Sequence, residues 1–302
     1  MMDSKTTAFI LLPISLIGFA VNWAVMYACT KVKTHKHSFI LLTGSQAFAD
    51  AVHATAFLFY YTPMVVFDSS LLIEYSPYCG YILLLCYELS VYTHLIISVN
   101  CFLAAYTPFY FRAFFRIKNT RIILVLAYLI ISIATFFFYG LKCHMFYRRE
   151  IGFFFFTDTP FCNNVGWYWD FLKNCTVLVL IFVFDLATLY GVKIQGKKMS
   201  TTVSERTNRR AEARERTFLY QAILQDAVFL FEIVSYFIFP KFLTNKWLIF
   251  FSTSFSWVAI HAIDGIITVV CNKEVRKFIF RCGKQRQNST ATTSETRRQN
   301  AT

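Results

Sequence analysis

Residues 79–103 read CGYILLLCYELSVYTHLIISVNCFL, a stretch that contains no Lys or Arg and only one acid, Glu88. As an α-helix rising about 1.5 Å per residue, it would be roughly 37 Å long, enough to cross the roughly 30 Å hydrocarbon core of a bilayer. Six further stretches of this kind occur along the chain. We therefore predict seven spans, at residues 8–30, 39–61, 79–103, 121–141, 170–192, 217–240 and 247–271.

The gaps between these spans alternate in charge. Most of the 30 Lys and Arg residues lie within or directly beside gaps 31–38, 104–120, 193–216 and 272–302. Basic residues are retained on the cytoplasmic side of a membrane. This pattern predicts an outside amino terminus and an inside carboxyl terminus. It also assigns the net charge of +13 to loops beside anionic lipid rather than to nucleic-acid binding.

Composition and motifs bound the class of protein. Hydrophobic residues make up 56% of the chain and charged residues 16%, well below the roughly 25% charge of soluble proteins. The predicted fold is an all-α, seven-helix membrane bundle forming one domain over residues 1–282. The sequence has no metalloprotease motif, no phosphate-binding glycine loop and no nucleophile elbow. We expect neither an enzyme nor a cofactor or metal site, and span seven has no Lys for a retinal Schiff base.

The segments at the cytoplasmic side carry two helical patterns. In residues 193–216, Glu205 and Arg209 have i,i+4 spacing, which predicts a helical extension of the sixth span. In residues 274–282, apolar Val275, Phe278 and Ile279 share one helical face and basic residues surround the other. This predicts a short amphipathic helix at the membrane surface. The polar tail 283–302 is predicted to be disordered.

Acidic and imidazole side chains occur inside several predicted spans, where an ionised group costs at least about 2.5–3.5 kcal/mol. Since no Lys or Arg falls in the central part of a span, we expect hydrogen bonds, water, protonation or sodium to satisfy the acids. Asn22, Asp50 and Asp264 fall near mid-membrane. We predict that they share a buried polar cluster, acting as structural glue, as a conformational switch, or as both.

The outer halves of the spans contain aromatic and polar residues suited to a small-molecule cavity between helices. For each residue, packing between helices is the competing interpretation. The outer gap 142–169 contains four consecutive Phe residues, 153–156, which fit interfacial packing or a lid over the cavity. The predicted ligand-binding residues are Tyr87, Glu88, Tyr92, Glu232, Tyr236, Trp257 and His261.

Nine cysteines occur in the chain, and most fall within spans. Cys79 and Cys162 lie on the predicted outer side, in an oxidising compartment where disulfides form. We predict a Cys79–Cys162 bridge, with Cys143 as the alternative partner for either residue.

At this point the chain resembles the rhodopsin-like seven-helix receptors, and more narrowly the nematode serpentine chemoreceptors of class X. Cys79 and Cys162 match the disulfide of that family. The other matching stretches are Gly18-x-x-x-Asn22, Phe48-Ala49-Asp50, Asn100-Cys101-Phe102, Pro108-Phe109-Tyr110, FRIKNTR at 115–121, Asp264-Gly265 and NKEVR at 272–276.

The resemblance implies a chemosensory receptor for a small molecule, coupled to a heterotrimeric G protein. It also implies a multi-pass protein of the plasma membrane, in sensory neuron cilia, with lipid and a second receptor copy or a different receptor as further partners. Nucleic acid is not an expected partner. The residues expected to face the G protein are Asn100, Cys101, Phe102, Pro108 and Tyr110.

One residue departs from the family pattern. Cys101 stands where the family has the Arg that engages the G protein. Its loss predicts altered coupling, constitutive signalling, a decayed receptor or a non-signalling partner subunit. A transporter or channel is a weaker alternative, because seven spans do not divide into equal halves and no internal repeat occurs.

Overall fold

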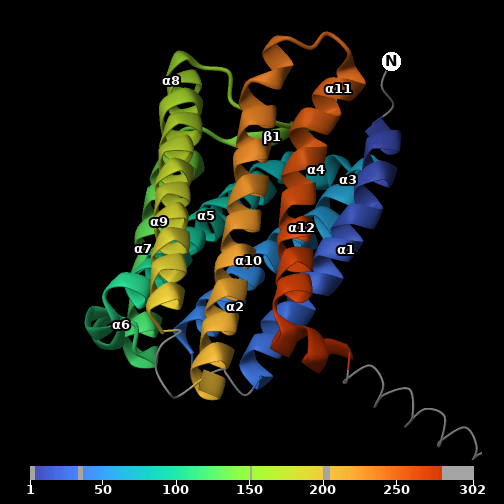
Figure 1. Cartoon of the computed structure of the whole chain (residues 1–302). Helices are drawn as coiled ribbons and strands as arrows, with labels where there is room; N and C mark the ends of the chain where they lie inside the picture. The colour runs from blue at the N-terminus through green and yellow to red at the C-terminus, as the bar shows by residue number, and fades with distance from the viewer. Residues whose placement is uncertain (1–3, 33–36, 150–151, 200–204, 281–302) are drawn as a thin grey trace, which may run out of the picture.

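The computed structural model describes residues 4–32, 37–149, 152–199 and 205–280; for residue 153 and for segments 193–199 and 205–216 it describes the backbone alone. Seven long helical segments lie side by side in one bundle (Figure 1). The first four are α1 (Ser4–Lys31); α2 (Ser38–Ala56) continued by η1 (Phe57–Tyr61) and α3 (Thr62–Val66); α5 (Ser76–Tyr106); and α7 (Ile117–Thr135) continued by η2 (Phe136–Gly140). The last three are α8 (Pro160–Asn164), η3 (Val165–Leu172) and α9 (Lys173–Met199) as one helix; α10 (Glu205–Phe237); and α11 (Lys246–Phe250), η5 (Phe251–Phe255) and α12 (Ser256–Cys271) as one helix.

Short elements join these helices at the two ends of the bundle. At one end lie α4 (Ser70–Glu74), the 3₁₀ turn η4 (Phe239–Lys241) and an antiparallel hairpin of β1 (Met145–Arg148) and β2 (Phe153–Phe156). We call this the hairpin end. The opposite end carries α6 (Pro108–Phe114) and the helical residues 273–280, and we call it the tail end (Figure 1).

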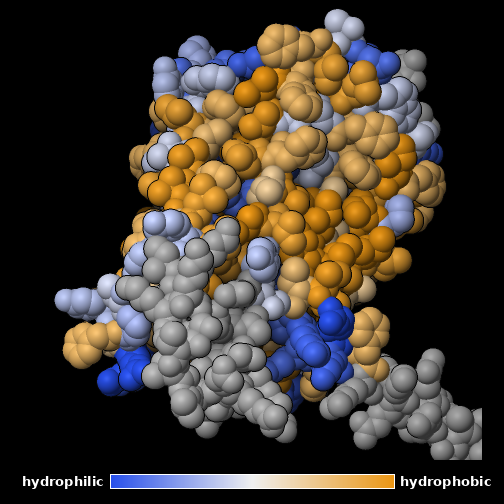
Figure 2. Space-filling view, in the orientation of Figure 1, coloured by the Kyte–Doolittle hydropathy of each residue, from blue (hydrophilic) through white to orange (hydrophobic). Residues whose placement is uncertain are grey.

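Length and composition support the membrane assignment. Six of the described helices are long and apolar enough to cross a bilayer. The second helix is less apolar because it carries Gln46, Asp50 and His53, yet it packs between α1 and α5 as a full member of the bundle. Figure 2 shows apolar side chains covering the middle of the molecule, with hydrophilic residues at both ends.

The third helix occupies the centre of the bundle. In the most apolar window of α5, 67% of residues are buried, against 22% in the helix formed by α7 and η2. The outward side chains of α7 are large and apolar, as a surface facing lipid requires. The helix α5 therefore runs through the interior of the bundle from the hairpin end to the tail end.

The fifth helix begins ten residues before its predicted start. Thr159 caps it by accepting a hydrogen bond from the Cys162 backbone N–H at 3.2 Å, and Pro160 occupies the first turn, where its missing N–H costs nothing. The sequence prediction missed this turn because Asn163, Asn164 and Gly166 interrupt the apolar pattern. The earlier start places Lys173 well inside the helix.

The hairpin packs onto the helix ends. Phe154 is buried against Tyr61, whose hydroxyl donates to the Gly152 carbonyl at 2.8 Å. Gly152 has φ of 83°, a conformation that glycine adopts without steric cost. The Phe153–Phe156 run is thus a strand that closes this end of the bundle, not an isolated interfacial patch.

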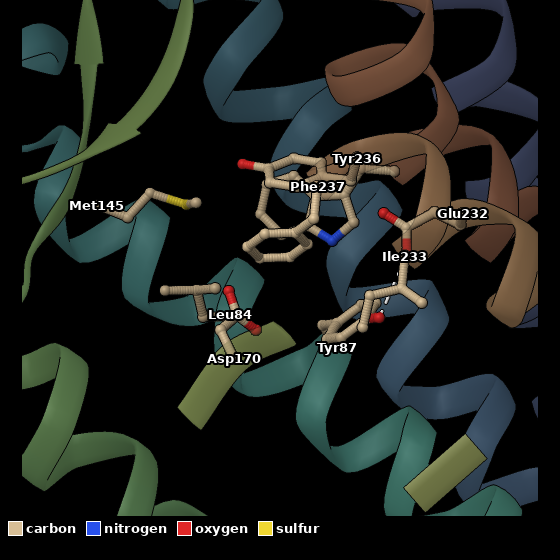
Figure 3. Close-up of a pocket in the computed structure, with 9 residues that line it drawn as sticks. Leu84, Tyr87, Met145, Asp170, Glu232, Ile233, Tyr236 and Phe237 are labelled. Atoms are coloured by element: carbon tan, nitrogen blue, oxygen red, sulfur yellow. Dashed lines mark hydrogen bonds between the residues drawn. The ribbon is translucent and has the colours of Figure 1, made fainter. Parts of the chain in front are cut away.

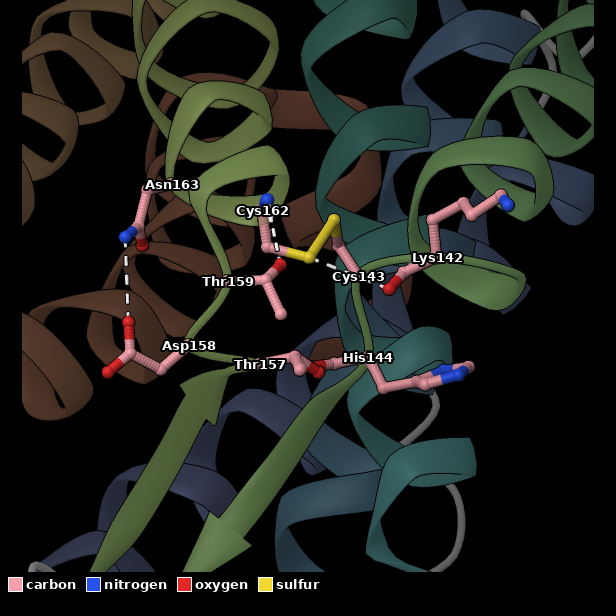
Figure 4. The surroundings of a disulfide bond; sticks show 8 residues. All are labelled: Lys142, Cys143, His144, Thr157, Asp158, Thr159, Cys162 and Asn163. Carbon is pink, nitrogen blue, oxygen red and sulfur yellow. Dashed lines mark hydrogen bonds between the residues drawn. A yellow bond between two sulfur atoms is a disulfide. The ribbon is translucent and has the colours of Figure 1, made fainter.

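The disulfide prediction was wrong about one partner. Cys162 is bonded to Cys143, with Cα atoms 5.3 Å apart, whereas Cys79 is buried and not disulfide-bonded (Figure 4). The hairpin reverses the chain and brings Cys143 and Cys162 together at its base. The bridge therefore closes the hairpin loop and does not tie it to α5.

Two further helical predictions concern segments at the tail end. The sixth helix begins at Glu205, as the predicted extension requires. Residues 273–280 are helical. Val275 is fully buried in an apolar cluster with Phe39 and Phe218, and Phe278 packs against this cluster. Residues 281–282 and the tail 283–302 lie outside the described residues.

Candidate functional site

A cavity lies inside the hairpin end of the bundle (Figure 3). The space between its lining atoms, including the part open to solvent, amounts to about 300 Å³. It is lined from α5, β1, η3, α10 and α12 by Leu84, Tyr87, Met145, Asp170, Glu232, Ile233, Tyr236, Phe237 and Trp257.

Two buried carboxyl groups face this cavity, and each has a neutral hydrogen-bond donor. The Tyr87 hydroxyl donates to Oε2 of Glu232 at 3.2 Å, and Nδ2 of Asn174 donates to Oδ1 of Asp170 at 3.3 Å. Glu232 is 3% exposed and Asp170 is 7% exposed. Among the described side chains, neither acid has a cation within ion-pairing distance.

A third acid beside the cavity is paired. Nζ of Lys173 lies 2.6 Å and 2.5 Å from the two carboxylate oxygens of Glu88. The same ammonium lies 5.5 Å from the ring centroid of Tyr92 and 5.1 Å from that of Trp169. The expectation that no acid has a basic partner at its own depth is wrong for Glu88, because the fifth helix starts early and carries Lys173 inward.

The structure brings together four of the seven predicted ligand residues, namely Tyr87, Glu232, Tyr236 and Trp257. Glu88 and Tyr92 lie beside the cavity, behind Lys173, and His261 lies deeper in the bundle. Asp170, Met145 and Phe237 also line the cavity and are not among the predicted ligand residues. An acid within the aromatic run WYWDFL could have indicated Asp170, whereas Met145 reaches the cavity only through the hairpin.

A buried polar cluster lies below the cavity, toward the middle of the bundle. Nδ1 of His261 is 2.7 Å from Oδ1 of Asp50, and the Ser90 hydroxyl donates to the same oxygen at 2.9 Å. The buried carboxyl group of Asp264 lies near Asp50 and interacts with it electrostatically. The amide of Asn22 donates to the backbone carbonyl of His261 at 2.8 Å. These contacts join the first, second, third and seventh helices.

Gly265 is required for this arrangement. A Cβ atom at this position would lie 2.3 Å from Oδ1 of Asn22, so only glycine lets the first and seventh helices approach this closely. The sequence motifs Gly18-x-x-x-Asn22 and Asp264-Gly265 therefore meet in space.

A series of ring contacts connects the cavity to the polar cluster. Trp257, which lines the cavity, packs edge-on against His53, with ring centroids 5.1 Å apart. His53 packs on His261 at 3.8 Å, and His261 contacts Asp50. A continuous series of side-chain contacts thus runs from Trp257 through His53 and His261 to Asp50.

Two further acids lie between the fifth and sixth helices. Asp185 accepts a hydrogen bond from the Ser98 hydroxyl at 2.5 Å. Both carboxylate oxygens of Asp226 are buried without a hydrogen-bond partner among the described residues.

A second cavity, of about 460 Å³ including space open to solvent, lies at the tail end. Asn100 and Cys101 line it together with Phe39 and Phe218, whose rings stack at 4.0 Å and 10°. The Asn100 amide donates to the Ser38 hydroxyl at 2.9 Å. No acid and no Lys or Arg is among the described residues that line this space.

The residues predicted to face a G protein do not form one surface. Asn100 and Cys101 face the tail-end cavity, whereas Phe102 packs on Phe184 of the fifth helix at 5.3 Å. Pro108 occupies the first turn of α6, and Tyr110 is 56% exposed there.

The fold defines the class of protein. The structure is similar to the crystal structure of squid rhodopsin, with a TM-score of 0.76 at 15% sequence identity, covering 93% of this chain and 81% of that one. The chain therefore has the seven-helix fold of the rhodopsin-like receptors, and six of its described helices are long and apolar enough to cross a membrane.

Sequence comparison narrows the class to a family. The model of the serpentine seven-transmembrane chemoreceptors Srx matches residues 12–272, and the chain belongs to that family. It is 27% identical over 293 residues to serpentine receptor class X 45 of Caenorhabditis elegans, covering 91% of this chain and 81% of the relative. It is 24% identical over 280 residues to serpentine receptor class X-43 of the same organism, covering 88% and 83%.

Proposed function

We propose that this protein is a chemosensory receptor that binds a small molecule at its hairpin end and signals to a heterotrimeric G protein at its tail end. Family membership and the rhodopsin-like fold support the receptor class. The charge pattern of the loops supports an orientation with the hairpin end outside. The ligand contacts are Tyr87, Asp170, Glu232, Tyr236 and Trp257, with Glu88 and Tyr92 acting through Lys173.

The observation that carries this proposal is the line of contacts from Trp257 through His53 and His261 to Asp50. A ligand favours one bundle state only if it binds the two states with different affinity. Contact with Trp257 supplies that difference, because the Trp257 ring position fixes the packing of the polar cluster. Asn22, Asp50 and Asp264 then act as both interhelical contacts and switch.

The protein acts in the plasma membrane, and by family in sensory cilia. Its receptor domain spans residues 1–282, followed by a cytoplasmic tail. Lipid contacts the apolar side chains that cover the middle of the molecule. The receptor domain pairs with a second copy of itself or with another receptor.

The test is a nucleotide-exchange assay on purified heterotrimeric G proteins, with the native chain in lipid nanodiscs. A ligand found in a metabolite screen should raise exchange in the native chain, and Trp257→Ala should remove that response while leaving surface expression intact. A response that is unchanged in Trp257→Ala would contradict the proposed route.

A second function is favoured by Cys101, which lines the tail-end cavity where the family has an arginine. In that case the chain is a non-signalling partner subunit. Exchange that stays at the level of empty nanodiscs in the native chain and rises in Cys101→Arg would favour this second function. Ligand-dependent current without G protein would instead favour a channel.

A further inference from the structure

The hairpin-end cavity has an unbalanced charge. Around it lie the carboxyl groups of Glu88, Asp170 and Glu232, and the single described ammonium close to them is that of Lys173. Lys173 is bound to both oxygens of Glu88, and no ion pair joins it to Asp170 or Glu232 among the described side chains, so one ammonium serves three acids. Asp170 and Glu232, which line the cavity, receive only the neutral donors Asn174 and Tyr87.

Aromatic rings form much of the remaining wall. The cavity is faced by Tyr87, Tyr236, Phe237 and Trp257. In Figure 3, Tyr236 and Phe237 lie opposite Asp170, whereas Glu232 lies close to the hydroxyl of Tyr87. The face of an aromatic ring attracts a cation, by about 2 kcal/mol or more where water is excluded. Carboxylates beside aromatic faces are therefore the chemistry that selects an organic ammonium.

The protein already binds an ammonium in this way. Nζ of Lys173 sits between the Glu88 carboxylate and the rings of Tyr92 and Trp169. A second ammonium, that of Lys241, lies 3.9 Å from the ring centroid of Trp167 at the same end of the bundle. Both arrangements use the kinds of side chain that line the cavity.

We propose that the cavity binds a small organic cation, a primary or secondary amine with an apolar or aromatic group. The ammonium lies between Asp170 and Glu232, and the apolar group packs against Phe237, Trp257 and Met145. A carboxylate ligand would meet two buried acids and no Lys or Arg among the described residues that line the cavity, and a neutral ligand would leave both acids without a counter-charge. This inference rests on the proposed function, because it names the ligand class of that same site.

The experiment measures thermal unfolding of the full-length receptor in nanodiscs with three probes of matched skeleton. These are 2-phenylethylamine, 2-phenylethanol and phenylacetate. Two smaller amines, ethylamine and benzylamine, test how large an apolar group the cavity accepts. We expect at least one amine to raise the unfolding temperature saturably, and the alcohol and the carboxylate to raise it less or not at all.

The cavity variants are Asp170→Asn and Glu232→Gln, which keep side-chain size and remove charge. Each should weaken the apparent affinity for the amine at least tenfold. The matched controls are Asp158→Asn and Glu74→Gln, exposed acids at the same end, and they should leave it unchanged. The unfolding temperature of each variant without probe reports whether it still folds.

Three outcomes would overturn the inference. They are equal or greater stabilisation by phenylacetate or 2-phenylethanol, no stabilisation by any amine, and an amine effect that survives in both cavity variants. Binding is read here without a G protein. A chain that binds amines but does not activate a G protein would contradict the proposed function and not the amine site. A chain that signals but prefers carboxylates would contradict the amine site and not the proposed function.

Discussion

The two ends of the bundle are built from different chemistry. The hairpin end holds buried acids, an ammonium and aromatic rings around a cavity, and all four π-helical turns of the described chain, η1, η2, η3 and η5, lie in this half. A π turn inserts a residue and re-aims the side chains near it, which is why such turns recur at functional sites. The tail end is closed by stacked Phe39 and Phe218.

The proposed function assigns ligand recognition to the hairpin end and signalling to the tail end. Charged and hydrogen-bonding side chains lie around the cavity of the hairpin end. At the tail end, none of the described residues that line the cavity is an acid, a lysine or an arginine. The stacked rings of Phe39 and Phe218 join the second and sixth helices there, and we expect a displacement of the sixth helix to break this contact.

The largest effect is expected from breaking the charge balance at the hairpin end. Lys173→Met leaves the Glu88 carboxylate buried without its cation, which costs on the order of 3–5 kcal/mol. Thermal unfolding of the purified variant should show this loss, and Glu88→Gln combined with Lys173→Met should recover most of it. As a control, Lys241→Met removes a cation that lies over Trp167 and has no acid partner among the described residues, and it should have little effect. Equal losses in both lysine variants would contradict the pairing.

The next effect concerns the covalent closure of the hairpin. Cys143→Ser removes the disulfide between cysteines that are 19 residues apart in the sequence. In the chain-entropy model this lowers the free energy of unfolding by at most about 3 kcal/mol. Peptide mapping under non-reducing conditions should find Cys143 linked to Cys162 in the native chain. In the variant, the Cys162 thiol should become reactive to maleimide. A Cys79–Cys162 peptide in the native chain would refute this connectivity.

A smaller effect is expected at the centre, where both ends are joined. Gly265→Ala forces a Cβ atom against the Asn22 side chain, and overpacking of this kind costs about 1–3 kcal/mol. The unfolding temperature should fall accordingly. Asn22→Ala in the same chain should relieve part of the strain, and additive losses in the double variant would contradict direct contact.

The smallest change in stability is expected at the tail end. Phe218→Leu removes the stack on Phe39, a loss of about 0.5–1.5 kcal/mol for the aromatic pair. The cavity should open more often, so that maleimide labels Cys101 faster, as read by mass spectrometry. Phe109→Leu, at a side chain that is 80% exposed, should leave the labelling rate unchanged.

Sequence reasoning was strongest where hydrophobicity alone decides the structure. Continuous apolar runs predicted each long helix, because a bilayer requires them whatever their neighbours are. The motifs around Asn22, Asp50 and Asp264 predicted which mid-membrane residues the structure brings together. These residues sit near helix centres, where errors in the helix ends matter little.

Sequence reasoning was weakest where one segment depends on another. The early start of the fifth helix depends on the Thr159 cap, and the missed start concealed the Lys173–Glu88 pair. The Cys143–Cys162 bond depends on a hairpin that four consecutive Phe residues do not specify. Asp170 and Met145 join the cavity only once both of these features are in place.

The central claim is that this chain still couples to a G protein and is held closed at the tail end by the Phe39–Phe218 stack. Nucleotide exchange on a panel of heterotrimeric G proteins tests it without knowledge of the ligand, comparing nanodiscs that carry the native chain, Phe218→Leu or Phe109→Leu. The account predicts a severalfold rise in basal exchange for Phe218→Leu over the native chain and the control. Exchange that matches empty nanodiscs in all three, on every G protein tried, would contradict it.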